Sequence, residues 1–149
     1  MKPLLLAALA ALISQQTLAF GETGRWSSGW GQGVSEYMVK DAKGNQLYIA
    51  CSNDGQTPAV MTLTVGGKEY GYGSNQDFVL IIDGNAPLAP SDAGSNAGGD
   101  NFRLAWEGIR KAKTLVAKTA DGKAIPLPLT GAAKTLPASK SKTYSCVTW

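Results

Sequence analysis

Hydrophobic and polar residues alternate along two stretches of the chain, residues 46–51 and residues 60–65. A period of two is typical of β-strands that bury one face and expose the other. After the second stretch, Gly66-Gly67 predicts a two-residue hairpin turn. The same reasoning places further strands at residues 34–40, 68–72, 78–82, 114–119 and 124–129.

Two of these segments also carry a prediction about their place in a sheet. The run at residues 78–82 is apolar without interruption, which suits a central strand covered on both faces. Residues 124–129 contain Pro126 and Pro128, and proline cannot donate a hydrogen bond to a neighbouring strand. We therefore expect that segment to lie at the edge of its sheet.

The periodicity changes in residues 101–113, where apolar side chains recur every three or four positions. This spacing predicts a helix with one apolar face, and Asp100 is a suitable N-cap. The residues of that face are Phe102, Ala105, Trp106, Ile109 and Ala112. The pattern predicts a β-rich α+β fold, a mostly antiparallel sheet or sandwich of about six to eight strands. We expect the single helix, in the C-terminal half, to pack on one face of it.

Residues 1–19 have the pattern of a secretory signal peptide. Lys2 supplies a positive charge, residues 4–13 are apolar, and a more polar stretch leads to Ala19. We expect cleavage near Ala19 and Phe20. An apolar run this short cannot span the roughly 30 Å core of a bilayer as a helix, so no stable membrane span is expected after cleavage. The mature protein is therefore predicted to be periplasmic or secreted.

Residues 20–33 form a glycine-rich segment that also carries Trp26 and Trp30. Its five glycines predict an arm without regular structure. The two tryptophans either fold back onto the core or remain available to a partner, and the large area of an aromatic ring favours folding back. Both are kept as possible partner-binding residues.

Residues 34–149 are long enough for a single β-rich domain with one hydrophobic core. Within it, residues 84–99 hold glycines, prolines and small polar residues, and Leu88 is the sizeable apolar side chain among them. A loop of this length in a compact domain is either functional or disordered, and we expect it to be flexible in the free protein. Leu88 and Asp92 are its possible partner-binding residues.

The chain has two cysteines, Cys51 and Cys146, and both lie in the part that would be exported. An even number of cysteines in an oxidising compartment favours a disulfide. The alternative is two unrelated buried thiols. The chain has no histidine, and two cysteines cannot complete a tetrahedral zinc shell, so we expect no metal site.

The lack of histidine also excludes a nucleophile that histidine would activate. Paired carboxylates remain the candidate chemistry for a hydrolase. The candidate carboxylates are Glu36, Asp54, Glu69, Asp77, Asp83 and Glu107. Each has a simpler explanation in a loop, at a strand end or in a surface ion pair. We therefore expect a protein that is not an enzyme and that binds no cofactor.

Charge is distributed unevenly along the chain. Residues 20–102 contain four basic and nine acidic residues, whereas residues 103–149 contain nine basic and two acidic residues. Folding can interleave the two halves and remove this asymmetry. Alternatively, the second half presents a basic face to an acidic partner or to an anionic envelope surface. The basic residues are dispersed and lack interleaved aromatic residues, so they do not indicate nucleic-acid binding.

Several segments follow one another in a familiar order: a strand ending in cysteine, an amphipathic helix, an apolar strand, a Leu-x-Gly-x-Ala segment and a last cysteine close to tryptophan. In this chain they are residues 47–51, 102–113, 114–118, 129–133 and 146–149. This order resembles small exported bacterial proteins of the VasI/TagO type, accessories of type VI secretion, and the invasion-associated locus B proteins. The resemblance covers residues 46–149. It implies a periplasmic β-rich domain with a bridge between Cys51 and Cys146 and without catalytic residues.

The resulting hypothesis is a non-enzymatic periplasmic binding or accessory protein. It would act on another protein of the cell envelope or of a secretion system through exposed loops or a sheet edge. One alternative is an inhibitor or immunity factor that plugs the cleft of an enzyme such as a lysozyme, with residues 84–99 as the plug. Another is a carboxylate-based hydrolase. The oligomeric state stays open.

Overall fold

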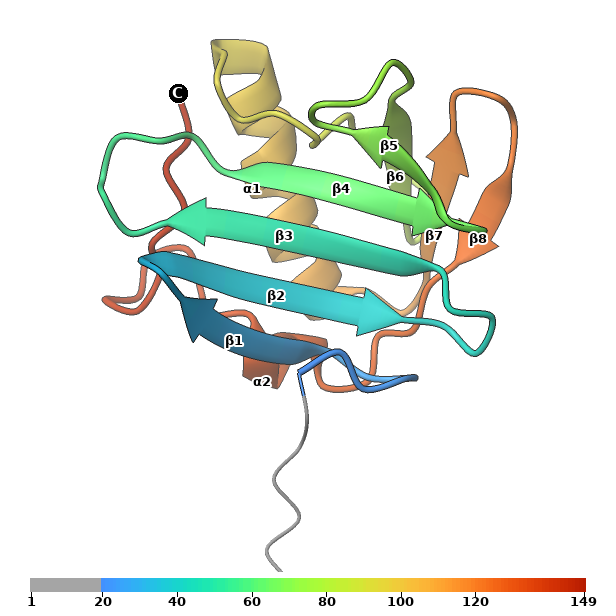
Figure 1. The fold of residues 1–149 in the computed structure, drawn as a ribbon, viewed down its shortest axis with the longest axis horizontal. Helices are drawn as coiled ribbons and strands as arrows, with labels where there is room; N and C mark the ends of the chain where they lie inside the picture. The colour runs from blue at the N-terminus through green and yellow to red at the C-terminus, as the bar shows by residue number, and fades with distance from the viewer. Residues whose placement is uncertain (1–19) are drawn as a thin grey trace, which may run out of the picture.

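The computed structural model describes residues 20–149 (Figure 1). The predicted signal peptide, residues 1–19, lies outside the described residues. The described chain forms eight strands in two antiparallel sheets, with one main helix, so the predicted β-rich fold is confirmed. The first sheet has the order β1 (Ser27–Gly31), β2 (Val34–Lys40), β3 (Gln46–Ser52), β4 (Val60–Val65) and β5 (Lys68–Gly71). The second has the order β6 (Phe78–Ile82), β7 (Leu115–Thr119) and β8 (Ala124–Pro126).

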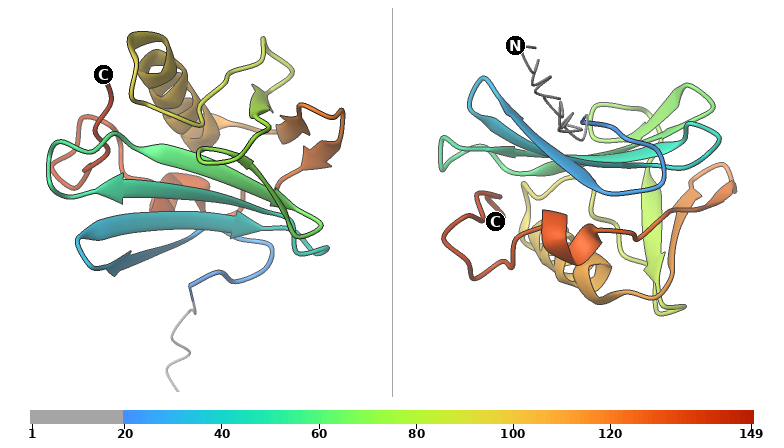
Figure 2. Two further views of the ribbon diagram at one scale, coloured as in Figure 1. Left: turned by 45° about the horizontal axis from the view of Figure 1, so that its top comes forward. Right: turned by 90° about the horizontal axis from the view of Figure 1, so that it is seen from below.

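The five-stranded sheet forms one layer of the molecule (Figure 2). One side of this sheet is covered by helix α1 (Asn96–Lys111), the short helix α2 (Ala132–Thr135) and the second sheet. Alternate residues of β2, β3 and β4 are buried between the layers, as the period of two predicts. Leu47 and Leu63, for example, face each other across β3 and β4. A slip by one residue would turn such pairs toward solvent, so the hydrophobic pattern sets the register.

Helix α1 begins earlier than its apolar pattern predicts. Ser95 is the N-cap, and its hydroxyl accepts a hydrogen bond from the N–H of Gly98 at 3.1 Å. The prediction of Asp100 as the N-cap is therefore wrong, because Asp100 lies inside α1, in its second turn. The helix ends at Lys111, close to the expected end.

Two glycines in the first turn of α1 explain that difference. A Cβ atom on Gly98 would lie 2.0 Å from the carbonyl oxygen of Asp92, and one on Gly99 would lie 2.1 Å from that of Trp149. Glycine costs about 1 kcal/mol relative to alanine inside a helix, so the local sequence does not favour a helix here. Only glycine leaves room for these backbone contacts. The contacting residues lie outside the stretch whose periodicity predicted the helix, so the pattern could not indicate its true start.

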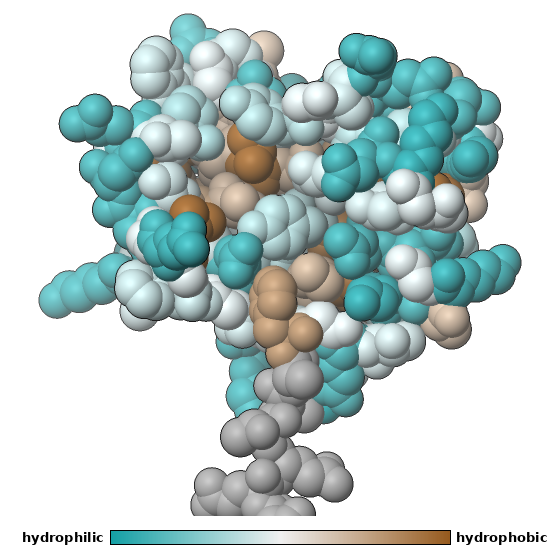
Figure 3. Space-filling view, in the orientation of Figure 1, coloured by the Kyte–Doolittle hydropathy of each residue, from teal (hydrophilic) through white to brown (hydrophobic). Residues whose placement is uncertain are grey.

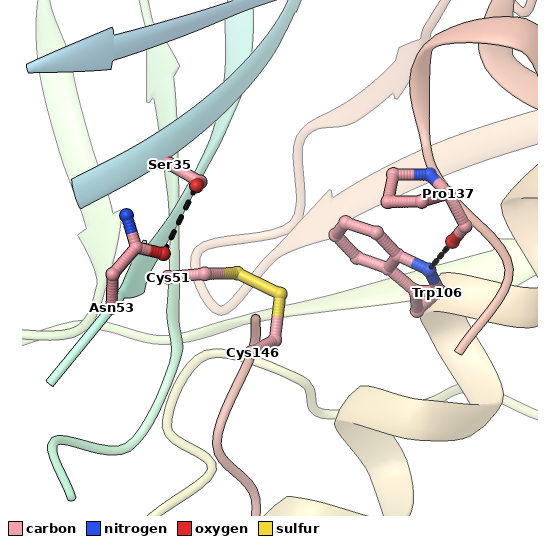
Figure 4. The surroundings of a disulfide bond; sticks show 6 residues. All are labelled: Ser35, Cys51, Asn53, Trp106, Pro137 and Cys146. Atoms are coloured by element: carbon pink, nitrogen blue, oxygen red, sulfur yellow. Dashed lines mark hydrogen bonds between the residues drawn. A yellow bond between two sulfur atoms is a disulfide. The ribbon is translucent and has the colours of Figure 1, made fainter. Parts of the chain in front are cut away.

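Trp106 is the fully buried anchor of α1. Its ring makes edge-to-face contacts with Tyr37 of β2 and with Tyr144, at centroid distances of 5.0 Å and 5.3 Å. Its indole N–H donates a hydrogen bond to the carbonyl oxygen of Pro137 at 2.8 Å (Figure 4). One side chain thus joins the large sheet, the helix and the C-terminal segment.

Strand β6 is not the central strand that its apolar sequence predicts. It lies at one edge of the second sheet, and its residues alternate between buried and half-buried. Its free edge is covered by Leu88, which exchanges two backbone hydrogen bonds with Leu80 at 2.8 and 2.9 Å. The prediction for the proline-containing segment is confirmed, because β8 lies at the opposite edge and ends at Pro126.

Residues 84–99, where a flexible loop was expected, are held against the sheets by backbone hydrogen bonds. The N–H of Met61 donates to the carbonyl oxygen of Ser91 at 2.9 Å, and the N–H of Ala93 donates to that of Ala59 at 3.0 Å. The last four residues of the segment already belong to α1. The amino-acid composition of residues 84–99 could not indicate that they are fixed in place, because the hydrogen bonds that hold them come from β4 and β6 rather than from the segment itself.

Cys51 and Cys146 form a disulfide with their Cα atoms 4.5 Å apart (Figure 4). The predicted bridge is confirmed, and the alternative of two separate thiols is excluded. Beside it, Pro58 and Val147 form an isolated backbone bridge, so the C-terminal segment is part of the folded domain. Within residues 20–149, no helix is long and apolar enough to cross a membrane.

Candidate functional site

The segment that was expected to lack regular structure contains strand β1. It pairs with β2 over its whole length, from Ser27 with Met38 to Gly31 with Val34. The two-residue turn between them is Gln32-Gly33, and both residues have positive φ, 50° and 79°. This conformation produces the tight hairpin. The dipeptide Gln32-Gly33 was the signal that could have revealed the hairpin and its strand.

The two tryptophans of this segment lie in opposite environments. Trp26 is only 3% exposed, and its indole N–H donates to the carbonyl oxygen of Pro128 at 3.1 Å. Trp30 is 71% exposed. The expectation that both fold back is therefore right for Trp26 and wrong for Trp30. Trp30 lies opposite Ser35, whose hydroxyl bonds to Asn53, so no apolar surface receives its ring there.

The register of β1 shows which of its backbone groups are unpaired. Gly31 and Val34 flank the two-residue turn and form a hydrogen-bonded pair, and such pairs alternate with non-bonded pairs along the ladder. Ser28 and Trp30 therefore point their N–H and C=O groups away from β2, along the free edge of the sheet. The N–H of Trp26 has the same direction and is bonded to the carbonyl oxygen of Thr130 at 2.9 Å.

This edge is thus partly occupied by the chain itself. Residues 128–130 bond to Trp26, and the chain then turns at Gly131 into α2. The free part of the edge begins at Ser28. β1 forms the lower edge of the large sheet in Figure 1, with α2 behind it.

A groove of about 280 Å³ runs below this free edge, on the inner side of the sheet. One wall is formed by β1 and β2, and the other by α2 and the segment that follows it. The lining residues are Ser28, Gly29, Ser35, Tyr37, Lys134, Thr135, Pro137 and Thr143. Burial raises the pKa of Tyr37, so its phenol stays neutral at ordinary pH. The groove therefore offers hydroxyl groups and one ammonium group.

The other sheet edges of the described chain carry features that prevent strand addition. Edge strand β5 exposes Lys68 and Glu69, and β8 ends at Pro126. The edge of β6 is covered by Leu88. Charged residues, prolines and covering segments are the usual means of blocking an edge. Strand β1, with the sequence Ser-Ser-Gly-Trp-Gly, has none of these in the stretch from Ser28 to Trp30.

A second concave region lies on the opposite, outer face of the large sheet. It measures about 300 Å³ and is lined by Val34, Ala50, Ser52, Thr57, Pro58, Val60, Tyr72 and Asp92. Figure 3 shows hydrophobic residues in a hollow over the left part of this sheet. The side chain of Asp92 accepts a hydrogen bond from the N–H of Gly94 at 2.8 Å, which holds it at the rim. Tyr72 is 57% exposed beside it.

The four residues that the sequence suggested for partner binding are therefore not brought together. Trp26 is part of the core, and Leu88 covers the edge of β6. Trp30 lies at the free edge of β1, and Asp92 lies at the rim of the outer groove. Sequence reasoning missed Tyr37 and Lys134, because they come from distant segments and carry no local motif.

Most of the candidate carboxylates have structural hydrogen bonds. The side chain of Asp83 accepts bonds from the N–H groups of Lys113 and Thr114, which lowers its pKa. That of Asp54 accepts bonds from Gln56 and Thr57. Glu36 accepts a bond from the hydroxyl of Tyr48 at 2.5 Å on the outer face. Between residues 20 and 149, no cluster of three or more His, Cys, Asp or Glu residues is arranged to hold a metal ion.

The two acidic residues of the C-terminal half are also engaged. Glu107 accepts bonds from Arg110 at 2.8 Å and from the N–H of Ser139 at 2.7 Å, and the Ser139 bond is the main cause that lowers its pKa to about 2. Asp121 accepts a bond from Thr119 at 2.5 Å, the largest cause of its pKa of about 2. Both carboxylates are therefore ionised and bonded within the domain.

A family model described as YfjT matches residues 24–136, which include all eight strands and both helices. No curated protein and no solved structure matches the chain.

Proposed function

The chain belongs to the YfjT family, and we propose that it is a non-enzymatic binding protein of the bacterial periplasm. It acts on another envelope protein by adding an extended segment of that partner to the edge of β1. The observation that carries this proposal is the unprotected edge, where the backbone groups of Ser28 and Trp30 point outward beside an exposed ring. The disulfide between Cys51 and Cys146 supports an oxidising compartment such as the periplasm.

Strand addition uses the chemistry that this edge offers. The partner backbone would bond to the N–H and C=O groups of Ser28 and Trp30, each bond contributing about 0.5–1.5 kcal/mol net. Its side chains would alternate between the groove and the outer side of the sheet. The ring of Trp30 would cover the new hydrogen bonds and exclude water from them, as aromatic anchors do in interfaces.

An accessory role in a secretion system is part of the same proposal. The VasI/TagO resemblance supports it through the order of segments from the strand ending in Cys51 to the last four residues, 146–149. In that case the partner is a secretion component with an exposed extended segment.

Capture with edge variants tests the proposal. Ser28→Pro removes one outward N–H, and Trp30→Lys replaces the ring by a charge; both should lose a partner that the unchanged protein captures from periplasmic extract. Tyr72→Lys is the matched control, because it changes another exposed aromatic residue, in the outer groove. Loss of the same partner with Tyr72→Lys, and its retention with both edge variants, would instead assign binding to the outer face. Thermal unfolding of each variant shows that the fold is intact.

The inhibitor alternative is favoured by one observation. Residues 84–87 are exposed after the end of β6, and the side chain of Asp83, which precedes them, accepts bonds from the N–H groups of Lys113 and Thr114. An exposed turn anchored at its base is suitable for entering an enzyme cleft. Asn85→Trp enlarges this tip, so a plug should lose inhibition of lysozyme, whereas binding at β1 should not change.

A further inference from the structure

We infer that the segment added to β1 is acidic, with carboxylate side chains at alternate positions that face the groove. This inference rests on the proposed function, and it names the chemistry of the partner. It is carried by charge complementarity between the groove below β1 and an extended chain.

The wall of the groove opposite β1 is basic. Residues 131–149 contain Lys134, Lys140 and Lys142 and no aspartate or glutamate. Lys134 lines the groove itself, and Lys142 directly precedes Thr143, which also lines it. All three lysines are exposed, and within the described part of the chain none of them forms an ion pair.

The two carboxylates of the C-terminal half already have partners within the domain. Glu107 is bonded to Arg110 and Ser139, and Asp121 is bonded to Thr119 and Tyr70. Their bonds within the domain leave the excess positive charge of the C-terminal half on the lysines. The asymmetry seen along the chain is therefore not removed on this side of the molecule.

The nearest acidic residue on the neighbouring strand does not face the groove. Glu36 lies opposite Gly29, and its side chain is on the outer face, where it accepts a hydrogen bond from the hydroxyl of Tyr48. At the other end of the free edge, the guanidinium of Arg25 lies near Gly131, with its Nε 3.9 Å from a Cβ placed there. An added strand therefore meets positive charge at Arg25 and along the lysine wall.

The geometry also sets the spacing of the carboxylates. In an extended chain every second side chain points to the same side. The free edge spans Ser28 to Trp30, so the added strand is short and places two successive inward side chains over the groove. Carboxylates at these positions reach toward Lys134 and Lys142.

The test uses two synthetic peptides and the disulfide-bonded protein. The first is Thr-Glu-Val-Glu-Val-Thr, and the second has glutamine in place of both glutamates. Backbone amide NMR shifts at Ser28 and Trp30 report binding at the edge, and titration gives the dissociation constant. We expect the acidic peptide to bind about fivefold more tightly than the glutamine peptide at low salt, with the difference shrinking at high salt.

Three variants assign that difference. Lys134→Gln and Lys142→Gln should each reduce the preference for the acidic peptide, whereas Lys118→Gln on β7 is the matched control and should not. Ser28→Pro should abolish binding of both peptides.

Several results would overturn the inference. Equal affinity for both peptides at the edge removes the charge preference while leaving strand addition intact, so failure of the inference is distinguishable from failure of the proposed function. Acidic-peptide binding that survives Ser28→Pro, or no amide shift at the edge with either peptide, overturns it as well. So does binding to anionic lipid vesicles that depends on Lys134 and Lys142 but not on Ser28, because the basic wall would then serve a membrane surface.

Discussion

Trp26 and Trp30 are four positions apart in one glycine-rich segment, yet one is buried and the other is exposed. Trp26 precedes β1 and packs against a distant part of the chain. There the carbonyl oxygen of Pro128 accepts a hydrogen bond from its indole N–H, and that of Thr130 accepts one from its backbone N–H. Trp30 lies near the turn of the hairpin, opposite the polar Ser35. The same residue type therefore stabilises the domain in one case and remains available in the other.

The comparison shows what decides the role of an aromatic residue in a flexible sequence. Burial of a large apolar ring must offset the entropy of ordering its segment. Trp26 has both an apolar site and a hydrogen-bond acceptor, so it anchors the segment. Once Trp26 and the pairing with β2 have ordered the strand, Trp30 is held in position without contributing its own burial.

Replacing Trp26 by alanine should have the largest effect. The change empties a core site and leaves the carbonyl of Pro128 without its donor, so we expect a loss of about 3–5 kcal/mol in the free energy of unfolding. Urea unfolding followed by circular dichroism measures it. A loss below about 1 kcal/mol would mean that Trp26 does not anchor the arm.

Removing the disulfide should have the next largest effect. The bridge closes a separation of 95 residues and holds the C-terminal segment, which forms one wall of the groove. The double variant Cys51→Ser/Cys146→Ser should lose about 2–4 kcal/mol, because the unfolded chain regains the entropy of an open loop. Urea unfolding checks this value. The unchanged protein, unfolded without reductant, should show no thiol that reacts with a thiol reagent, and two reactive thiols would contradict the bridge.

Acid should weaken the wall of the groove by a smaller amount. Glu107 has its pKa lowered from 4.5 to about 2, chiefly by the Ser139 N–H, so its stabilising contribution is present above pH 4.5 and is lost as the pH falls through this range to about 2. We expect a loss of about 1–2 kcal/mol for its charged hydrogen bonds, since the pair is partly exposed.

The difference between the unchanged protein and Glu107→Gln isolates this contribution, because Asp54 and Asp121 also have lowered pKa values. The midpoint of urea unfolding is measured from neutral pH downward. The two proteins should differ near neutral pH and converge in acid. Parallel curves would show that Glu107 does not supply the pH dependence.

Replacing Trp26 by phenylalanine separates ring burial from hydrogen bonding. Phenylalanine keeps most of the apolar area but cannot donate to Pro128, so we expect a loss of about 1 kcal/mol. Trp30→Phe is the control and should not change the free energy of unfolding. Equal losses in the two variants would contradict the different roles assigned to the two residues.

Replacing Trp30 by alanine should have the smallest effect on stability, within about 0.5 kcal/mol, because its ring is largely exposed. Acrylamide quenching complements this measurement. In variants that retain only one tryptophan, emission from Trp30 should be quenched readily and emission from Trp26 should be protected. Protection of Trp30 would place its ring against the domain and remove it from the proposed edge site.

The parts of the fold that the sequence predicted are those with a regular pattern of their own. Strands β2, β4 and β6 have the expected bounds. In β4 and β6 the alternating or continuous apolar residues reflect a single local geometry. The edge position of β8 followed from the absence of an N–H on proline. The disulfide followed from the number of cysteines in a chain expected to be exported.

The remaining features depend on distant contacts. Strand β1 has no hydrophobic period, since Trp30 is the one large apolar residue among its serines and glycines, and its conformation comes from pairing with β2. The start of α1 depends on the close approach of Asp92 and Trp149 to two glycines. The candidate site could be named only in part. Trp30 was recognisable from the sequence as a large aromatic residue that could bind a partner, but Tyr37 and Lys134 are brought to the groove only by the fold.

The position of residues 146–149 has a consequence for the order of folding during synthesis. Cys146 closes the disulfide, Val147 pairs with Pro58, and the N–H of Trp149 donates to the carbonyl oxygen of Ala93 at 3.0 Å. These bonds cross most of the chain, and contacts of such high sequence separation form late. The hydrophobic inner face of the large sheet therefore stays uncovered until α1 and these residues have been made.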